Sequence, residues 1–436
     1  MFAIIAAFLN TLPLLPLLLL NPAPTARPNI VFILADDLGQ GNLSCYGADR
    51  FRTPEIDRLA HEGLRLTRFH TAPLCGPSRA LIISGRYAFR TGATNQDACA
   101  EIDRSELILP QMLRQAGYAT GFVGKWGQLT GTARAAGFED CLTFRGSGVY
   151  WKPSAGEQLY DLNGATRSLQ EGEYMPQLMQ QHALQFLKSN RERPFFLYYS
   201  LSHVHGELTR TPLSGASPDD LMAENLLWMD AQIGELRAAL EELGLAKQTL
   251  LIFMGDNGTG KGQADRATIG GRMLAGSKGT MQDGGCLVPF ICCWPGQVPA
   301  GRVSAQLVDA TDLVPTFTAL VGGSLKQAPP VDGRSFEWLL RGREPQPETQ
   351  RQWVYSQLAR MWFVRNDRWK LDQSGNLFEL TDAPFAEQLI TADQESAAAT
   401  TARRQLSAVL GELNPAGGKL DQGDGTGRHA KRKKSQ

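Results

Sequence analysis

The sequence predicts an α/β protein with a large, mixed but mainly parallel sheet sandwiched by helices, followed by a small C-terminal α+β subdomain with an antiparallel sheet. Two observations lead to this prediction. Short apolar runs, typical of buried strands, alternate with segments of helical periodicity along most of the chain. Beyond a segment rich in Gly and Pro at 322–334, the runs become shorter and follow one another closely, as in an antiparallel meander.

Individual elements follow from the same patterns. The clearest helix is expected at 220–243, where leucine and isoleucine recur at helical spacing, and another is expected at 177–187. An Ala-rich segment at 395–413 predicts a closing helix. The expected strands are 29–34, 118–123, 194–201, 249–254 and 287–293 in the large sheet, and 353–358, 361–366, 368–372 and 376–380 in the small one.

The chain divides into four expected parts. Residues 2–20 are nearly all apolar and precede small residues and prolines, which predicts a signal peptide within 1–26 and export to the periplasm or out of the cell. A retained N-terminal membrane anchor is the alternative. The main domain is expected at 27–325 and the subdomain at 326–414. The Gly-rich and then basic segment 415–436 is expected to be a disordered tail.

Composition excludes some classes of partner. Lysine plus arginine equals aspartate plus glutamate, at 44 each, so net charge gives no attraction to nucleic acid or to an anionic membrane. We therefore expect no nucleic-acid partner, and no stable membrane association unless the N-terminal segment is retained. The seven cysteines are an odd number, and the pattern predicts no particular disulfide.

Polar groups follow four of the expected strands at the point where each strand ends. In open α/β sheets, ligands bind beyond the carboxyl ends of the strands, so these groups are expected to meet at one edge of the sheet. They are Asp36-Asp37, Lys125, His203 with His205, and Asp256-Asn257.

The acidic members of this set predict a metal site. Asp36, Asp37, Asp256 and Asn257 offer only hard oxygen ligands, and no histidine or cysteine pair accompanies them at zinc spacing. Such ligands suit Ca²⁺, or less well Mg²⁺, rather than a transition metal.

A cysteine motif indicates the nucleophile. In Cys75-Gly76-Pro77-Ser78-Arg79, the proline fits the first turn of a helix, which places Cys75 at the helix N-terminus. The helix dipole favours negative charge there, so a cysteine nucleophile is one interpretation, although the segment supplies no histidine base.

Cys75-x-Pro77-Ser78-Arg79 with Gly85-Arg86 resembles the signature of type I sulfatases, the formylglycine-dependent, arylsulfatase-like enzymes of the alkaline phosphatase superfamily. The resemblance extends over about residues 28–380. It includes the blocks ARPNIVFILADDLGQGNLSCYG, TPEIDRLAHEGLRLTRFH, GYATGFVGKW, FMGDNG, GSKGTMQDGGCLVPFICCWPG and DGRSF. It implies an alkaline phosphatase-like fold and hydrolysis of sulfate esters with release of inorganic sulfate. The substrate class would be a sulfated small molecule or polysaccharide.

The resemblance implies that a formylglycine-generating maturation enzyme oxidises Cys75 to an aldehyde. Hydration of this aldehyde gives a gem-diol. One hydroxyl attacks sulfur, with its pKa lowered by the metal, and the other lets sulfate leave as the carbonyl re-forms. Asp36, Asp37, Asp256 and Asn257 then resemble the Ca²⁺ ligands, together with the modified Cys75 side chain.

Further roles are carried over by position. Arg79 resembles the arginine that steadies the aldehyde hydrate, and Lys125 and Lys278 resemble the lysines that hold sulfate oxygens. His205 resembles a histidine that donates a proton to the leaving oxygen. Ser147 matches a polar contact to the substrate.

The chain departs from the family pattern after Lys125. The family reads Gly-Lys-Trp-His, whereas this chain has Gly127 and then Gln128, an amide that can hydrogen-bond the substrate but cannot accept a proton. We hypothesise that His203 takes over the missing role, because strand side chains two apart share a face. His70 is expected to line the approach to Cys75.

Two other functions remain open. One is hydrolysis of phosphonate or phosphate esters by the same superfamily chemistry. The other is a degenerate sulfatase that binds sulfated glycans without turnover. Substrate specificity is expected from region 143–175 and the C-terminal subdomain.

Overall fold

The structure is a computed structural model that describes residues 27–213, 220–343 and 347–429. The expected signal peptide at 1–26 lies outside these residues. Within the described ranges, no helix combines the length and the apolar character needed to cross a bilayer.

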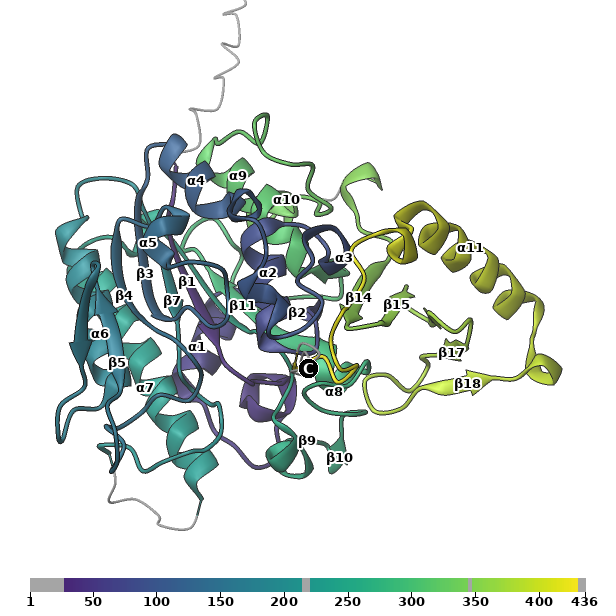
Figure 1. Ribbon diagram of the computed structural model, residues 1–436, viewed down its shortest axis with the longest axis horizontal. Coiled ribbons are helices and arrows are strands. Elements are labelled where there is room, and N and C mark those ends of the chain that lie inside the picture. Colours follow the sequence, from purple (N-terminus) through teal and green to yellow (C-terminus); the bar gives the residue numbers. More distant parts are fainter. Residues whose placement is uncertain (1–26, 214–219, 344–346, 430–436) are drawn as a thin grey trace, which may run out of the picture.

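An eleven-stranded mixed sheet forms the centre of the main domain (Figure 1). Its order is β12-β2-β11-β8-β1-β7-β3-β4-β5-β6, with β13 paired to β2. The run β8-β1-β7-β3-β4 is parallel, whereas β11 is antiparallel to both of its neighbours. The bounds are β1 Asn29–Ala35, β2 Leu64–His70, β3 Ala119–Lys125, β4 Asp140–Phe144, β5 Leu159–Leu162, β6 Ala165–Ser168, β7 Phe195–Ser200, β8 Thr249–Gly255, β11 Leu287–Cys293, β12 Arg302–Ser304 and β13 Val308–Asp309.

Helices cover both faces of the sheet because the strands are apolar on both sides. In β1, alternate side chains enter two separate cores. One core is closed by α2 (Cys75–Ser84), α4 (Ile108–Gln115) and α9 (Leu313–Val321). The other is closed by α1 (Pro54–Glu62), α6 (Met175–Ser189) and α7 (Leu221–Glu242), on the left of Figure 1. The predicted fold class is confirmed.

A second, five-stranded antiparallel sheet follows in the order β14-β15-β16-β17-β18. Residues of β15 and β16 pack against Ala402 and Leu406 of α11 (Ala397–Leu413), seen on the right of Figure 1. The preceding α10 (Glu337–Leu340) instead packs into the core of the main domain. The strands are β14 Val354–Leu358, β15 Met361–Arg365, β16 Trp369–Asp372, β17 Leu377–Glu379 and β18 Gln388–Ile390.

The C-terminal segment differs from the expected disordered tail over residues 415–429. A short 3-10 helix at Pro415–Gly417 is followed by a chain that packs on the main domain. Asp421 is 1% exposed and accepts hydrogen bonds from Thr94 Oγ1 and Asn95 Nδ2. Hydrogen bonds rather than apolar burial hold this segment, and composition does not report such bonds. Residues 430–436, with their lysine and arginine run, lie outside the described residues.

Candidate active site

Four neighbouring parallel strands bring the predicted polar groups to one edge of the sheet. The order β8-β1-β7-β3 aligns their carboxyl ends, with Ala35 opposite Gly255 and Gly124 opposite Ser200. Lys125 is the last residue of β3 rather than a residue beyond it. The predicted convergence of these strand ends is therefore confirmed.

Backbone hydrogen bonds continue past the strands and fix the aspartates. The amide of Asp256 donates to Ala35 O at 2.9 Å, and that of Asp36 donates to His203 O at 2.7 Å. Asp37 has φ of +61°, a left-handed conformation that non-glycine residues seldom adopt, and its amide donates to Asp256 Oδ1 at 3.1 Å. Such conformations persist where the surroundings enforce them, which is common at functional sites.

Helix α2 brings Cys75 and Arg79 to the edge of the sheet where the aspartates lie. The helix begins at Cys75, as predicted, and Arg79 lies one turn later on the same face. The guanidinium of Arg79 donates to Asp256 Oδ2 through Nε at 3.0 Å and Nη2 at 2.8 Å. Its Nη1 donates to Ser200 Oγ at 2.5 Å, which fixes α2 against two strands of the sheet.

Two lysines pair with the aspartates after β1. Lys125 Nζ lies 2.6 Å from Asp36 Oδ2, and Lys278 Nζ lies 2.6 Å from Asp37 Oδ1. Burial by itself would raise the pKa of Asp36, but the charge of Lys125, helped by other nearby cations, holds that pKa below its usual range. Burial would lower the pKa of Lys278, yet Asp37 raises it above its usual value. Lys278 is therefore charged at neutral pH.

The arrangement fits a hard divalent cation. Asp36, Cys75 and Asp256 each offer a ligand atom, and these atoms lie within 4.8 Å of one another. In the described residues, buried Asp36 Oδ1 and Asn257 Oδ1 have no hydrogen-bond partner. Buried oxygens of this kind call for a cation, because leaving them unpaired costs about 1–3 kcal/mol each.

The charges of the site indicate which kind of substrate it would attract. The buried carboxylates of Asp36, Asp37 and Asp256 are balanced by three cations, namely Arg79, Lys125 and Lys278. Burial and the charge of Asp36 raise the pKa of Asp256 to about 6. A bound divalent cation would therefore leave the edge positive, which suits an anionic substrate.

Gln96 is a site residue that the sequence did not predict. Its Nε2 donates to Cys75 Sγ at 3.2 Å, and its Oε1 accepts from the amide of Gly76 at 2.9 Å. The same Nε2 donates to Gln128 Oε1 at 2.6 Å, so Gln128 is linked to Cys75 through a second amide. No motif surrounds Gln96 in the sequence, and only the fold reveals its place.

The departure at Gly127 has a conformational reason. Gly127 has φ of +73°, where a histidine would be strained, and a Cβ there would lie 3.5 Å from Arg79 Cδ. The turn therefore suits glycine, and the neighbouring amides of Gln96 and Gln128 occupy the surroundings of Cys75 instead.

His205 lies at the entrance to the cluster. Its Nε2 is 3.8 Å from Asp37 Oδ2, and the side chain is 22% exposed, so a substrate can reach it. Ser147 precedes Gly148, where a Cβ would lie 3.1 Å from His205 Nδ1. Gly148, the residue after Ser147, thus lies near His205, and no hydrogen bond of the Ser147 side chain is found within the described ranges.

His203 does not join this cluster. Its ring is fully buried, with Nε2 3.0 Å from Tyr174 OH and the ring beside Tyr150. Burial lowers its pKa to about 3, so the ring is neutral at physiological pH. The hypothesis of a replacement for the missing histidine assumed strand alternation, but β7 ends at Ser200 and the following chain does not alternate.

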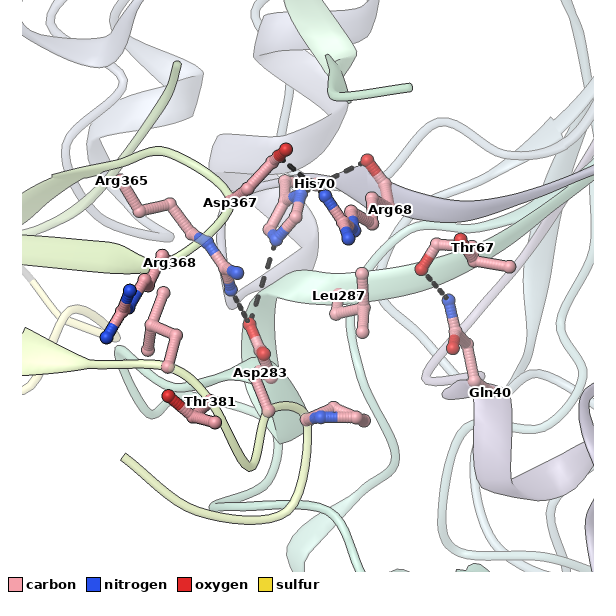
Figure 2. A pocket seen from close by; sticks show the side chains of 13 residues that line it. Gln40, Thr67, Arg68, His70, Asp283, Leu287, Arg365, Asp367, Arg368 and Thr381 are labelled. Atoms are coloured by element: carbon pink, nitrogen blue, oxygen red, sulfur yellow. Dashed lines mark hydrogen bonds and ion pairs between the residues drawn. The ribbon is translucent and has the colours of Figure 1, made fainter. Parts of the chain in front are cut away.

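His70 also faces elsewhere. It lines a cavity of about 700 Å³ between the main domain and the second sheet, shown in Figure 2. Its Nε2 lies 3.7 Å from Asp283 Oδ1, to which Arg365 donates at 2.7 Å. The expectation that His70 lines the approach to Cys75 is therefore wrong, because β2 turns the ring toward Asp283.

A second cavity, of about 540 Å³, opens directly on the cluster. Asp37, His205 and Lys278 form part of its wall, together with Lys261 and Arg428.

The seven cysteines, all of them in described residues, form no disulfide. Cys75 is buried, and it is not held in a disulfide.

Removing one carboxylate should weaken metal binding. We predict that Asp36→Asn lowers Ca²⁺ affinity at least about tenfold, because the site loses a charged hard ligand. Isothermal titration of the two proteins after chelator treatment measures this. Glu242→Gln, at the exposed end of α7, is the control and should match the wild type. Equal affinities for Asp36→Asn and wild type would place any calcium site elsewhere.

The chain is similar to known proteins of one family. The sequence model of the Sulfatase family matches residues 28–323. Arylsulfatase D of Homo sapiens is 32% identical over 409 residues, covering 73% of this chain and 69% of that protein. N-acetylgalactosamine-6-sulfatase of Canis lupus familiaris is 32% identical over 339 residues, covering 70% of this chain and 63% of that protein.

Solved structures show the same fold. Ps i-CgsB in complex with k-i-k-neocarrahexaose has a TM-score of 0.76 at 25% identity, covering 88% of this chain and 93% of that chain. The phosphonate monoester hydrolase SpPMH from Silicibacter pomeroyi has a TM-score of 0.65 at 19% identity, covering 89% of this chain and 95% of that chain. This second likeness concerns the fold alone. The matched family and the curated relatives together establish that the chain belongs to the sulfatase family and is a hydrolase of sulfate esters.

Proposed function

We propose that the chain hydrolyses sulfate esters of a sulfated carbohydrate with a formylglycine made from Cys75 as nucleophile and with Ca²⁺ as metal. The observation that carries this proposal is the meeting of Cys75 with Asp36 and Asp256 at the buried N-terminus of α2. A maturation enzyme would oxidise Cys75 before the site becomes active. The signal peptide expected at 1–26 supports export to the periplasm or out of the cell.

The metal and the modified residue have defined places in this proposal. Asp36, Asp37, Asp256 and Asn257 would hold Ca²⁺, which acts as a Lewis acid and lowers the pKa of a bound hydroxyl. Once oxidised and hydrated, the side chain at position 75 would supply one hydroxyl to attack sulfur and displace the alcohol of the ester. Loss of the proton from the second hydroxyl would then expel sulfate as the aldehyde re-forms. The unpaired oxygens of Asp36 and Asn257 support this ligand set.

The cations of the site bind and orient the sulfuryl group. Lys125 and Lys278 approach from β3 and from the loop before α8 (Asp283–Cys286), and both point into the cluster of carboxylates. Their ammonium groups stabilise the negative charge on the sulfuryl oxygens in the transition state. Arg79, held by Asp256 and Ser200, keeps the first turn of α2 and the hydroxyls at position 75 in place.

Proton transfer to the leaving group falls to His205. It is the histidine that both borders the cavity and lies within 3.8 Å of an aspartate in the metal set. A protonated imidazole at this point can donate to the ester oxygen as the bond to sulfur breaks. Gln96, held by Gln128, would orient the side chain at position 75 by hydrogen bonding, but an amide cannot move a proton.

A carbohydrate substrate has support from two relatives. One is named for a sulfated sugar, N-acetylgalactosamine-6-sulfate, and the other binds a neocarrahexaose. Hydrolysis of phosphonate esters is the second candidate function, because a phosphonate monoester hydrolase shares the fold. Binding of sulfated glycans without turnover is the third, and the missing histidine at Gly127 is its support.

Turnover separates these functions. We expect the protein, matured with a formylglycine-generating enzyme, to hydrolyse an aryl sulfate faster than the matching aryl phosphonate. Cys75→Ala should lose at least about 10³-fold of the rate, because no other group supplies the nucleophile. Cys45→Ala, a half-buried cysteine outside the site, is the control. Preference for the phosphonate would favour the second function, and glycan binding without turnover would favour the third.

The role of His205 predicts a dependence on the leaving group. His205→Gln should lower the hydrolysis rate of a sugar sulfate by about 10²–10⁴-fold, because an alkoxide needs a proton to leave. The rate with nitrophenyl sulfate, whose phenolate leaves unaided, should fall by less than about tenfold. Paired steady-state kinetics of the two substrates test this, with exposed His61→Gln as control. Equal losses with both substrates would assign the proton to another group.

A further inference from the structure

Residues 419–429, which we call the C-terminal strap, are fastened beside the active site. The backbone amide of Lys419 donates to Phe89 O at 2.6 Å. Asp421 binds Thr94 Oγ1 at 2.9 Å and Asn95 Nδ2 at 2.6 Å, and its side chain is buried. The guanidinium of Arg360, from the turn between β14 and β15, donates to Asp421 O at 3.2 Å. Figure 1 shows the chain returning from α11 to this point.

Further along the chain, the strap contacts Gln96, the residue whose side chain lies beside Cys75. The backbone amide of Gln96 donates to Gly427 O at 2.9 Å, and the Gln96 side chain reaches Cys75 Sγ. Gly427 has φ of +77°, and a Cβ there would lie 2.5 Å from Leu358 Cγ, so only glycine fits at this crossing. The position of the following residue, Arg428, is thereby set by the same contacts that hold Gln96.

Arg428 lines the cavity that opens on the catalytic cluster, together with His205 and Lys278. Its side chain is exposed, and within the described residues it has no ion pair or side-chain hydrogen bond. Arg266, which lines the same cavity, is instead paired with Asp220. Lys261 adds a further positive charge, and Glu207 is a carboxylate in the wall.

An unpaired guanidinium in the wall of this cavity can bind an anionic group. Arginine binds sulfate and carboxylate groups through two parallel hydrogen bonds, and its planar fork selects such groups. Lys125 and Lys278 already account for the sulfate that is cleaved, so Arg428 is available for another anionic group on the same substrate. The lining therefore suits a glycan that carries more than one negative charge.

We propose that the C-terminal strap is part of the active site and that Arg428 binds a second anionic group, a sulfate or a carboxylate, next to the ester that is hydrolysed. This inference rests on the proposed function, since it concerns the substrate of that same site. Arg428 is thus a specificity residue, and the strap is the element that delivers it.

The test compares full-length variants on three substrates. These are a monosulfated aryl ester, a sugar with two sulfates, and a monosulfated sugar with a carboxylate. We expect Arg428→Ala to raise KM about fivefold at low salt for the doubly anionic sugars, because this is the upper end of what an exposed charge pair contributes. The kcat values, and both constants for the aryl ester, should stay within about twofold. Arg428→Lys should recover part of the loss.

The controls distinguish a failure of the inference on Arg428 from a failure of the proposed function. Arg404→Ala removes an exposed arginine on α11 and should leave all three KM values unchanged. A loss with the disulfated sugar alone would identify the second group as sulfate, and a loss with the carboxylated sugar alone would identify it as carboxylate. If Arg428→Ala has the same KM and kcat as the wild type for every substrate, the inference is overturned while the proposed function stays intact. A wild type that hydrolyses no sulfate ester would overturn the proposed function itself.

Discussion

The buried ion pair between Arg79 and Asp256 is the interaction on which the site depends. It joins the first turns of α2 to the end of β8, and Cys75 therefore lies against the carboxylates rather than merely near them. A buried guanidinium is stable only when its donors are satisfied, and here the Arg79 guanidinium donates to Asp256, to Ser200 Oγ and to Lys125 O. The place of the nucleophile is thus fixed by electrostatics as much as by packing.

The parallel sheet supplies the rest of the arrangement. Four strands end together, and the backbone bonds that continue beyond them hold Asp36 and Asp256 with little freedom to relax. Three carboxylates and three cations then balance within a buried volume. Such a preorganised set can bind a divalent cation and an anionic ester together, because the positive charge of the cation and the negative charge of the ester attract each other. The strap adds Arg428 to the wall of the cavity on the substrate side.

Much of this arrangement could be predicted from sequence, for identifiable reasons. Apolar runs and strand ends are local signals, so the strands, the start of α2 at Cys75 and the convergence of Asp36, Lys125 and Asp256 followed from them. Gln96 and Arg428 could not be predicted, because they reach the site through loop hydrogen bonds that leave no periodicity. The expected role of His203 assumed that strand geometry continues beyond β7, which ends at Ser200. The expected role of His70 failed because β2 directs its ring toward Asp283.

The central claim is that Cys75 becomes the nucleophile by oxidation, and the mass of the tryptic peptide FHTAPLCGPSR tests it most directly. The protein would be expressed with a formylglycine-generating enzyme, beside a control sulfatase that this enzyme is known to convert. The account predicts the mass of the aldehyde or of its hydrate at position 75. An intact thiol under conditions that convert the control would contradict it.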